Sequence, residues 1–279
     1  MANGELQIRD SGFDIADGRM RNGSVPVSVL VAQVPVSLDI ERNLEAILAV
    51  LDEAEEDDLI VLPEGALSGY SENPSFLEGV DVQRLSSSLR ALAEEVAGKG
   101  LHVVFGSCLW ETGGWYNAGL YFGPAGERFV YHKVNLATSE RGHFTPGSRL
   151  EVVQLSIGGR ALTLGIQLCR EIRYPEQWRY LARAGVQVFA YLTNAVDGDT
   201  EREAPVWRSH LVSRAAENQR FVLAANNAAP GQKCPSMIVA PDGRVVWEVL
   251  SDSTELKRCQ IDLAEVSGWY LSQTRDDVV

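Results

Sequence analysis

Basic residues are scarce in this sequence, and the shortage limits the partners that the protein can have. The 279 residues include 25 Lys and Arg against 38 Asp and Glu, which gives a formal net charge of −13 at pH 7. Proteins that bind nucleic acid present a basic patch to the phosphates, and anionic membrane surfaces attract basic segments. We therefore expect neither nucleic acid nor a membrane as a partner.

Cysteine is also scarce, and the four that occur are widely spaced. The sequence has no CxxC pair and no Cys/His cluster, which argues against a zinc ribbon or a disulfide framework. The N-terminal segment has neither a basic nor an apolar section of the signal-peptide type, and the apolar run Val25–Val36 is too short to span a bilayer. These features predict a cytoplasmic protein with reduced thiols.

Several catalytic motifs are absent as well. The chain has 25 glycines but neither GxGxxG nor GxxxxGK[ST], so nothing indicates a nucleotide-phosphate site. It also lacks HExxH and the GxSxG elbow, because Ser68 in GALSGY has the wrong spacing for that elbow. A zinc peptidase and a serine hydrolase of the elbow type are therefore not indicated.

Short apolar strands and amphipathic helices alternate along most of the chain. Residues 1–25 are rich in Gly and Asp without apolar periodicity, which predicts a flexible extension, and residues 26–279 are predicted to form one α/β domain. Glycine-containing turns between several strands predict mixed sheets with hairpins. The expected strands are Pro26–Val34, Leu59–Leu62, Leu101–Leu109, Asn117–Phe122, Glu127–Val134, Val152–Ile157, Ala161–Leu168, Val186–Leu192, Arg220–Ala225, the hairpin Ser236–Val249 and Arg258–Leu263; the expected helices lie around 44–51 and 85–96 and at Pro175–Ala184 and Pro205–Asn218.

Three polar residues stand where strands are expected to end or to be interrupted. Cys169 follows an apolar strand and precedes a helix, where free backbone N–H groups and a helix dipole lower a thiol pKa and can hold an oxyanion. Glu64 ends the buried strand LIVLP, and its alternative role is to pair with a backbone or Arg group. Lys133 interrupts the strand FVYHKVNL, where an outward edge charge is the alternative.

The other three cysteines carry weaker indications. Cys108 and Cys259 lie within apolar strands and are expected to be core residues, because free Cys packs as a small hydrophobe. Cys234 precedes Pro235 in a loop, and its role stays open.

Together these segments resemble the carbon–nitrogen hydrolase, or nitrilase, superfamily. The resemblance rests on LPEGALSGY, YHKVNL and LCREIRYPE, which carry Glu64, Lys133 and Cys169 in the family's order. Three further segments agree with it, and the likeness extends over about residues 26–264. These segments are ERGHFTPG from Glu140, SRAAEN from Ser213 and SMIVAPDG from Ser236.

The resemblance implies a fold and a mechanism. The fold would be a four-layer αββα sandwich whose sheets continue across a homodimer or a higher homo-oligomer, and residues 26–279 would be the hydrolase domain. Cys169 would attack an amide or nitrile carbon, and Glu64 would act as general base. Lys133 and the backbone N–H of Arg170 would hold the oxyanion, and Glu140 would hold Lys133. Water would be the second substrate, and neither a metal nor an organic cofactor would be required.

The substrate is less well indicated than the reaction. Tyr70, Asn194 and Trp207 are candidate pocket residues, with packing as the alternative, and a pocket-facing Arg170 would favour a substrate carboxylate unless it pairs with a surface acid. Nitrilases of the family more often show Trp-Glu after the cysteine, and Arg173 matches amidase-like branches. We therefore expect a hydrolase of a small linear amide or N-carbamoyl compound. The alternatives are a nitrilase and a non-catalytic binding protein that keeps the fold.

Overall fold

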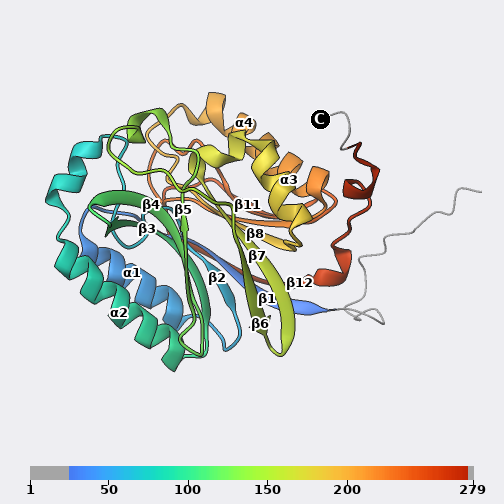
Figure 1. Ribbon diagram of the computed structural model, residues 1–279, viewed down its shortest axis with the longest axis horizontal. Helices are drawn as coiled ribbons and strands as arrows, with labels where there is room; N and C mark the ends of the chain where they lie inside the picture. Colours follow the sequence, from blue (N-terminus) through green and yellow to red (C-terminus); the bar gives the residue numbers. More distant parts are fainter. Residues whose placement is uncertain (1–24, 276–279) are drawn as a thin grey trace, which may run out of the picture.

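A computed structural model describes residues 25–275 of the chain. Twelve strands in this part of the chain form two six-stranded mixed sheets (Figure 1). In the first sheet the order is β12-β1-β2-β3-β4-β5, and β1, β2 and β3 run parallel. Its strands are β1 (Pro26–Gln33), β2 (Leu59–Val61), β3 (His102–Glu111), β4 (Gly114–Phe122), β5 (Arg128–His132) and β12 (Glu255–Asp262).

The second sheet repeats this arrangement. Its order is β11-β10-β9-β8-β7-β6, with β7, β8 and β9 parallel and hairpin partners at both edges. Its strands are β6 (Val152–Ile157), β7 (Arg160–Leu168), β8 (Val188–Leu192), β9 (Phe221–Ala225), β10 (Ser236–Val239) and β11 (Val245–Val249).

Four helices cover the outer faces of the two sheets. They are α1 (Ile40–Asp52), α2 (Val82–Gly98), α3 (Pro175–Arg183) and α4 (Thr200–Asn218). The helices α1, α2 and α4 begin after Asp39, Asp81 and Asp199, whose side chains accept backbone N–H bonds of the first turn. The short 3₁₀ turns are η1 (Pro74–Gly79), η2 (Thr138–Glu140), η3 (Cys169–Arg173), η4 (Leu263–Glu265) and η5 (Leu271–Gln273).

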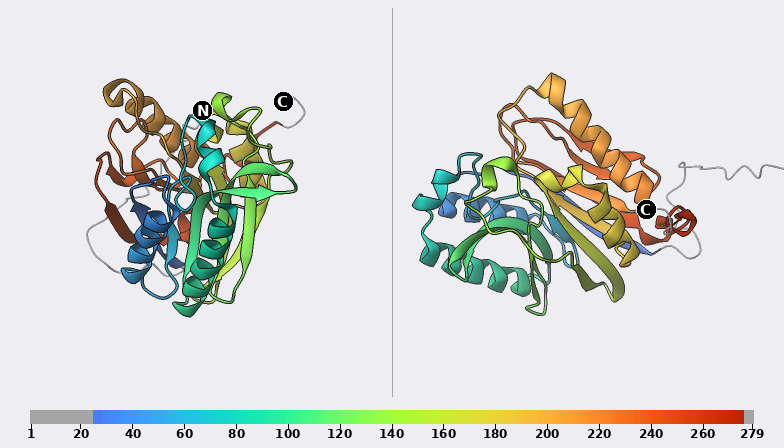
Figure 2. Two further views of the ribbon diagram at one scale, coloured as in Figure 1. Left: turned by 90° about the vertical axis from the view of Figure 1, so that its left-hand side faces the viewer. Right: turned by 45° about the horizontal axis from the view of Figure 1, so that its top comes forward.

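Apolar side chains fill three separate layers. The central layer lies between the two sheets and includes Val29 and Leu164. A second layer packs α1 and α2 on the first sheet, and a third packs α3 and α4 on the second sheet. Figure 2 shows both helix pairs on the outside and the sheets between them. The predicted αββα sandwich is thus confirmed, because each sheet buries one face on its partner and the other under helices.

Most element boundaries agree with the prediction, and two differences affect the site or its surroundings. The predicted strand Glu127–Val134 ends at His132, so Lys133 follows β5 instead of lying within it. The helix predicted to start at Pro205 starts at Thr200, because the side chain of Asp199 caps it, and Pro205 lies inside the helix. Residues 1–24 of the predicted extension lie outside the described part of the chain.

Candidate active site

Loops at the carboxyl ends of the strands bring the predicted residues together. Glu64 follows β2, Lys133 follows β5, and Cys169 follows β7. Glu140 is the last residue of η2. In open α/β sheets this end of the strands is where sites form, because the loops there converge. The first sheet thus supplies Glu64 and Lys133, and the second sheet supplies Cys169.

The ammonium group of Lys133 lies between two carboxylates. Its Nζ donates to Oε1 of Glu64 and to Oε1 of Glu140, each at 2.9 Å. The side chains of Lys133 and Glu64 are 0% exposed and that of Glu140 is 2% exposed. Lys133 is therefore a buried cation held by two buried anions. Its alternative interpretation as an outward edge charge is wrong.

Asn117, which the sequence interpretation missed, joins the same two carboxylates. Its Nδ2 lies 2.8 Å from Oε1 of Glu64 and 2.7 Å from Oε1 of Glu140. The hydroxyl of Tyr70 also donates to Oε1 of Glu140, at 3.0 Å. In the sequence, Asn117 is recognisable only as a polar residue in the otherwise apolar strand β4. That feature does not distinguish a residue of a site from a residue at the edge of a sheet.

Electrostatics keep Lys133 and Glu140 of this cluster ionised. Burial alone would lower the pKa of Lys133, but Glu64 and Glu140 outweigh burial and raise it. Burial alone would raise the pKa of Glu140, but Lys133 and the hydrogen bonds to Glu140 bring it below its ordinary value. Lys133 therefore stays protonated and presents a fixed positive charge.

The backbone around Cys169 is held in a strained turn. Cys169 has a φ of 38°, in the left-handed region that a residue with a Cβ rarely adopts. The Tyr191 hydroxyl donates to the Cys169 carbonyl at 2.8 Å, and the Leu168 N–H donates to Glu171 Oε2 at 2.9 Å. The surrounding structure thus fixes the Cys169 carbonyl and the backbone N–H of the preceding Leu168. Strain of this kind occurs mainly at functional sites.

The predicted lowering of the Cys169 pKa is wrong for the resting thiol. Burial and then the negative charge of Glu64 raise the pKa of Cys169 to about 12, although Lys133 and Thr193 act in the opposite direction. The position of Cys169 at the end of a strand indicated free N–H groups, but it indicated neither the burial of the thiol nor a neighbouring carboxylate. The resting thiol is therefore protonated at neutral pH.

Close backbone packing places Glu64. A Cβ on Gly106 of β3 would lie 2.4 Å from Cα of Glu64 and 2.5 Å from N of Gly65. Only glycine at position 106 lets the loop after β2 lie this close to β3. The Asn194 N–H, which follows β8 of the second sheet, donates to Oε2 of Glu64 at 3.1 Å.

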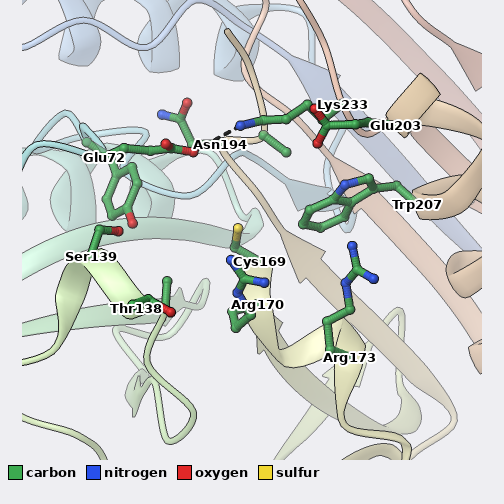
Figure 3. A pocket seen from close by; sticks show the side chains of 13 residues that line it. Glu72, Thr138, Ser139, Cys169, Arg170, Arg173, Asn194, Glu203, Trp207 and Lys233 are labelled. Carbon is green, nitrogen blue, oxygen red and sulfur yellow. Dashed lines mark hydrogen bonds and ion pairs between the residues drawn. The ribbon is translucent and has the colours of Figure 1, made fainter. Parts of the chain in front are cut away.

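A cavity of about 310 Å³ opens above Cys169 (Figure 3). The four predicted pocket residues Tyr70, Arg170, Asn194 and Trp207 all line it together with Cys169. Arg170 and Arg173 lie on one side of the sulfur in Figure 3, and Lys233 and Glu203 lie on the other. The other polar side chains in the lining are Glu72, Thr138 and Ser139.

Two cationic groups face this cavity without an acidic partner. Within residues 25–275, no carboxylate forms an ion pair with Arg170 or Arg173, whereas Lys233 pairs with Glu72 at 2.9 Å. Arg173 lies over the Trp207 ring, with its guanidinium carbon 5.4 Å from the ring centre. The surface-pairing alternative for Arg170 is therefore not what the described residues show.

The remaining cysteines lie away from the cavity lining. Cys108 and Cys234 are 0% exposed, and burial raises the pKa of both thiols. Cys259 in β12 is half-buried against the central layer. Cys108 is thus a core residue, as predicted, and Cys259 is one in part. Cys234, whose role the sequence left open, is also a core residue.

Residues 25–275 contain neither a metal-binding cluster nor a helix suited to span a membrane. This part of the chain contains no cluster of three or more His, Cys, Asp or Glu side chains placed to hold a metal ion. None of its helices combines the length and the hydropathy that a bilayer-spanning helix needs.

The carbon–nitrogen hydrolase family model matches residues 28–270. The chain belongs to the carbon–nitrogen hydrolase family. The match covers most of the described residues, including Glu64, Lys133, Glu140 and Cys169, so the protein is a hydrolase of this family and the predicted resemblance is confirmed.

Curated relatives of this carbon–nitrogen hydrolase span amidases and nitrilases. An (R)-stereoselective amidase of Pseudomonas sp is 31% identical over 246 residues, which cover 85% of each chain. An omega-amidase of Xenopus laevis is 26% identical over 88% of each chain. A nitrilase of Pyrococcus abyssi is 24% identical over 87% of this chain and 92% of its own.

Solved structures agree on the fold. A mutant of the Nesterenkonia sp. AN1 amidase, which carries the acetamide moiety of fluoroacetamide covalently added at its active-site cysteine, superposes with a TM-score of 0.76 at 22% identity. The superposition covers 94% of this chain and 98% of that chain. Nit3 of Saccharomyces cerevisiae, a member of the nitrilase superfamily, superposes with a TM-score of 0.72 at 21% identity over 91% of this chain and 97% of its own.

Proposed function

We propose that this carbon–nitrogen hydrolase cleaves a small linear amide or N-carbamoyl compound through an acyl-enzyme on Cys169. The observation that carries the proposal is the Lys133 ammonium, which is buried between Glu64 and Glu140 beside the strained Cys169 turn. The names of the amidase relatives support an amide over a nitrile as the substrate.

The first half of the reaction forms the acyl-enzyme. Glu64 takes the thiol proton as the sulfur attacks the carbonyl carbon, because the raised pKa of Cys169 leaves little thiolate beforehand. The developing oxyanion accepts from Lys133 and from the N–H of Arg170, which is the second residue of the η3 turn and has no acceptor within that turn. The C–N bond breaks as Glu64 passes its proton to the leaving ammonia or amine.

The second half releases the acid. Water attacks the thioester, Glu64 takes a proton from the water, and the Cys169 sulfur leaves and recovers a proton from Glu64. Glu140, together with Asn117, keeps Lys133 in place through both halves. Because two carboxylates fix its position, Lys133 needs no reorganisation when charge develops on the substrate oxygen.

The charges of the cavity support a substrate that carries a carboxylate. Arg170 and Arg173 line the cavity without an acidic partner among the described residues, in a protein of net charge −13. A guanidinium binds a carboxylate through two parallel hydrogen bonds. We therefore extend the proposal to an amide or carbamoyl compound with an acid group at the end remote from the scissile bond.

The organisation of the protein is proposed from the sequence. Residues 26–279 would form the hydrolase domain, and the protein would act as a cytoplasmic homodimer or higher homo-oligomer. Sedimentation of the purified full chain tests this part of the proposal.

Trapping of the acyl-enzyme tests the proposed reaction. Rapid acid quench of the protein with a library of amides and nitriles is expected to add an acyl mass at Cys169 for an amide. Cys169→Ala should abolish ammonia release while remaining folded, and the matched control Cys259→Ala should retain activity. Faster ammonia release from nitriles would favour a nitrilase. Failure of iodoacetamide to label Cys169 before the other thiols would favour a non-catalytic binding protein.

A further inference from the structure

Glu171, two residues after Cys169, is a buried carboxylate with no role in the proposed reaction. It is 0% exposed and lies outside the cavity lining. A carboxylate is costly to bury, and such a group is kept only where hydrogen bonds compensate for its lost hydration. The donors around Glu171 therefore indicate what the residue does.

Five donors converge on the Glu171 carboxylate, and they come from β5 and the segment after it, from β7 and from α3. Oε1 accepts from the Tyr131 hydroxyl at 2.7 Å, the Val134 N–H at 2.9 Å, the Asn135 N–H at 3.2 Å and the Gln177 amide at 3.3 Å. Oε2 accepts from the Leu168 N–H at 2.9 Å. Two of the donor residues are also bonded to each other, because the Asn135 side-chain amide donates to Gln177 Oε1 at 2.7 Å.

The chain positions of these donors relate the cluster to the active site. Val134 directly follows Lys133, and Tyr131 precedes Lys133 by two residues on β5 of the first sheet. Leu168 directly precedes Cys169 and ends β7 of the second sheet. One carboxylate thus fixes the backbone beside Lys133 to the backbone beside Cys169.

We propose that Glu171 is the positioning residue that sets the place of Lys133 relative to the Cys169 sulfur and holds the Cys169 turn in its left-handed conformation. The inference rests on the proposed function, in which both groups must meet one carbonyl. Glu171 acts through these two residues and touches neither the substrate nor the sulfur. Misplacement of a catalytic group by about 1 Å costs on the order of 10²-fold in rate.

The test substitutes Glu171 by an amide of the same shape. Glu171→Gln replaces one acceptor oxygen by an NH₂ group, which cannot serve the N–H of Leu168 and those of Val134 and Asn135 at once. The expected kcat for the best amide falls about 10²-fold while KM changes little, because the cavity lining is untouched.

Asp58 offers a matched control for loss of a buried carboxylate. It is 0% exposed, precedes β2 at the end of the strand opposite Glu64, and accepts from Ser28, the Glu55 N–H and Arg258. Asp58→Asn is expected to lower the melting temperature while kcat stays within about twofold of wild type. An equal loss of kcat in Asp58→Asn, or a wild-type kcat in folded Glu171→Gln, would overturn the proposal.

Tyr131→Phe keeps the inference testable if Glu171→Gln does not fold. This variant removes one donor of the five and keeps the buried ring, so a smaller fall in kcat at constant KM is expected, and an unchanged kcat would count against the proposal. Alkylation of Cys169 by iodoacetamide at pH 8 separates this inference from the proposed function. If wild type turns over no amide, the function fails, whereas about tenfold slower alkylation in Glu171→Gln than in Asp58→Asn still supports the positioning role.

Discussion

The proton on Cys169 decides which residues the proposed chemistry needs. Burial and Glu64 raise the pKa of this thiol to about 12, so attack on a substrate has to be coupled to proton removal by a nearby base. Glu64 is placed for this task by Lys133, Asn117 and the N–H of Asn194. Glu64 thus has two roles in the proposed reaction. Its negative charge raises the pKa of the Cys169 thiol, and its carboxylate accepts the thiol proton.

Glu64→Gln tests this double role. Turnover of an amide should fall on the order of 10²–10⁴-fold because the general base is lost. The alkylation rate of Cys169 at each pH between 7 and 11 should rise, because one negative charge that raises the thiol pKa has gone and more of the thiol is ionised. Alkylation rates measured by intact mass across pH 7–11, with ammonia release in parallel, check both outcomes.

Glu72→Gln is the control for the Glu64 substitution. Glu72 lines the cavity rim and pairs with Lys233, and its side chain is 73% exposed. We expect a near wild-type alkylation profile from this variant. An alkylation profile that does not move in Glu64→Gln would contradict the electrostatic account, and near wild-type turnover would contradict the base.

Lys133→Met should destabilise the protein in a pH-dependent way. Without the ammonium, Glu64 and Glu140 remain buried together, and breaking such a pair costs about 3–5 kcal/mol of unfolding free energy at pH 8. Burial then raises the pKa of Glu140 above its unfolded value, because Lys133 no longer lowers it. The penalty is therefore smallest below the unfolded pKa and grows as the pH rises through the folded one. Urea unfolding at pH 5 and pH 8 measures the difference.

Lys99→Met is the surface counterpart of this substitution. Lys99 pairs with Asp52 and Glu95 at the end of α2, where both carboxylates are exposed. Solvent screens such pairs, so we expect little change in stability at either pH. Equal pH dependence in the two variants would contradict the buried cluster.

At the residue scale, the sequence predicted which residues form the site better than it predicted their pKa values. Glu64, Lys133, Glu140 and Cys169 were placed by the resemblance, and the structure brings them to one site. Asn117 and Glu171 were missed, because their partners come from strands far apart in the chain. The direction of the Cys169 pKa shift was wrong, since burial depends on packing that the local sequence does not contain.

At the scale of elements, the backbone of β3 and the loop after β2 pack so closely that no side chain fits between them at Gly106. Gly106→Ala should cost at least about 1–3 kcal/mol, because the added Cβ meets backbone atoms of Glu64 and Gly65 that cannot move independently. It should also reduce kcat by displacing Glu64. Gly98→Ala, at the end of α2 with no atom within 4 Å of the added Cβ, should keep both stability and activity. Urea unfolding and amide turnover of both variants measure this.

Element types were predictable because each strand and helix has its own apolar periodicity. Val152–Ile157 has the predicted bounds, and α3 ends one residue before the predicted Ala184. The start of α4 was missed because its first turn has no apolar stripe and depends on the Asp199 cap. The last strand is longer than predicted, since its pairing with β1 along Pro26–Gln33 extends it.

At the scale of the whole molecule, β12 closes the first sheet and helps to fill the central layer. Ile261 pairs with Val27 and is 3% exposed, whereas its neighbour Gln260 is exposed. Ile261→Asp should cost about 3–5 kcal/mol because it puts an unpaired charge between the sheets. Gln260→Asp should change stability by less than about 0.5 kcal/mol. These effects are measured by the soluble yield and the unfolding midpoint of each variant. Similar values for the two variants would contradict the assignment of Ile261 to the buried face and Gln260 to the exposed face of β12.

The pairing of β1 with β12 also has a consequence for synthesis on the ribosome. β1 ends at Gln33, and its antiparallel partner begins only at Glu255. At about 5–20 residues per second, β1 emerges roughly 10–50 s before its partner has been translated. During that interval one edge of β1 has unpaired backbone groups that can bind another nascent chain or a chaperone. The first sheet can therefore be completed only after Glu255–Asp262 has been translated, and the yield of folded protein should depend on what protects that edge until then.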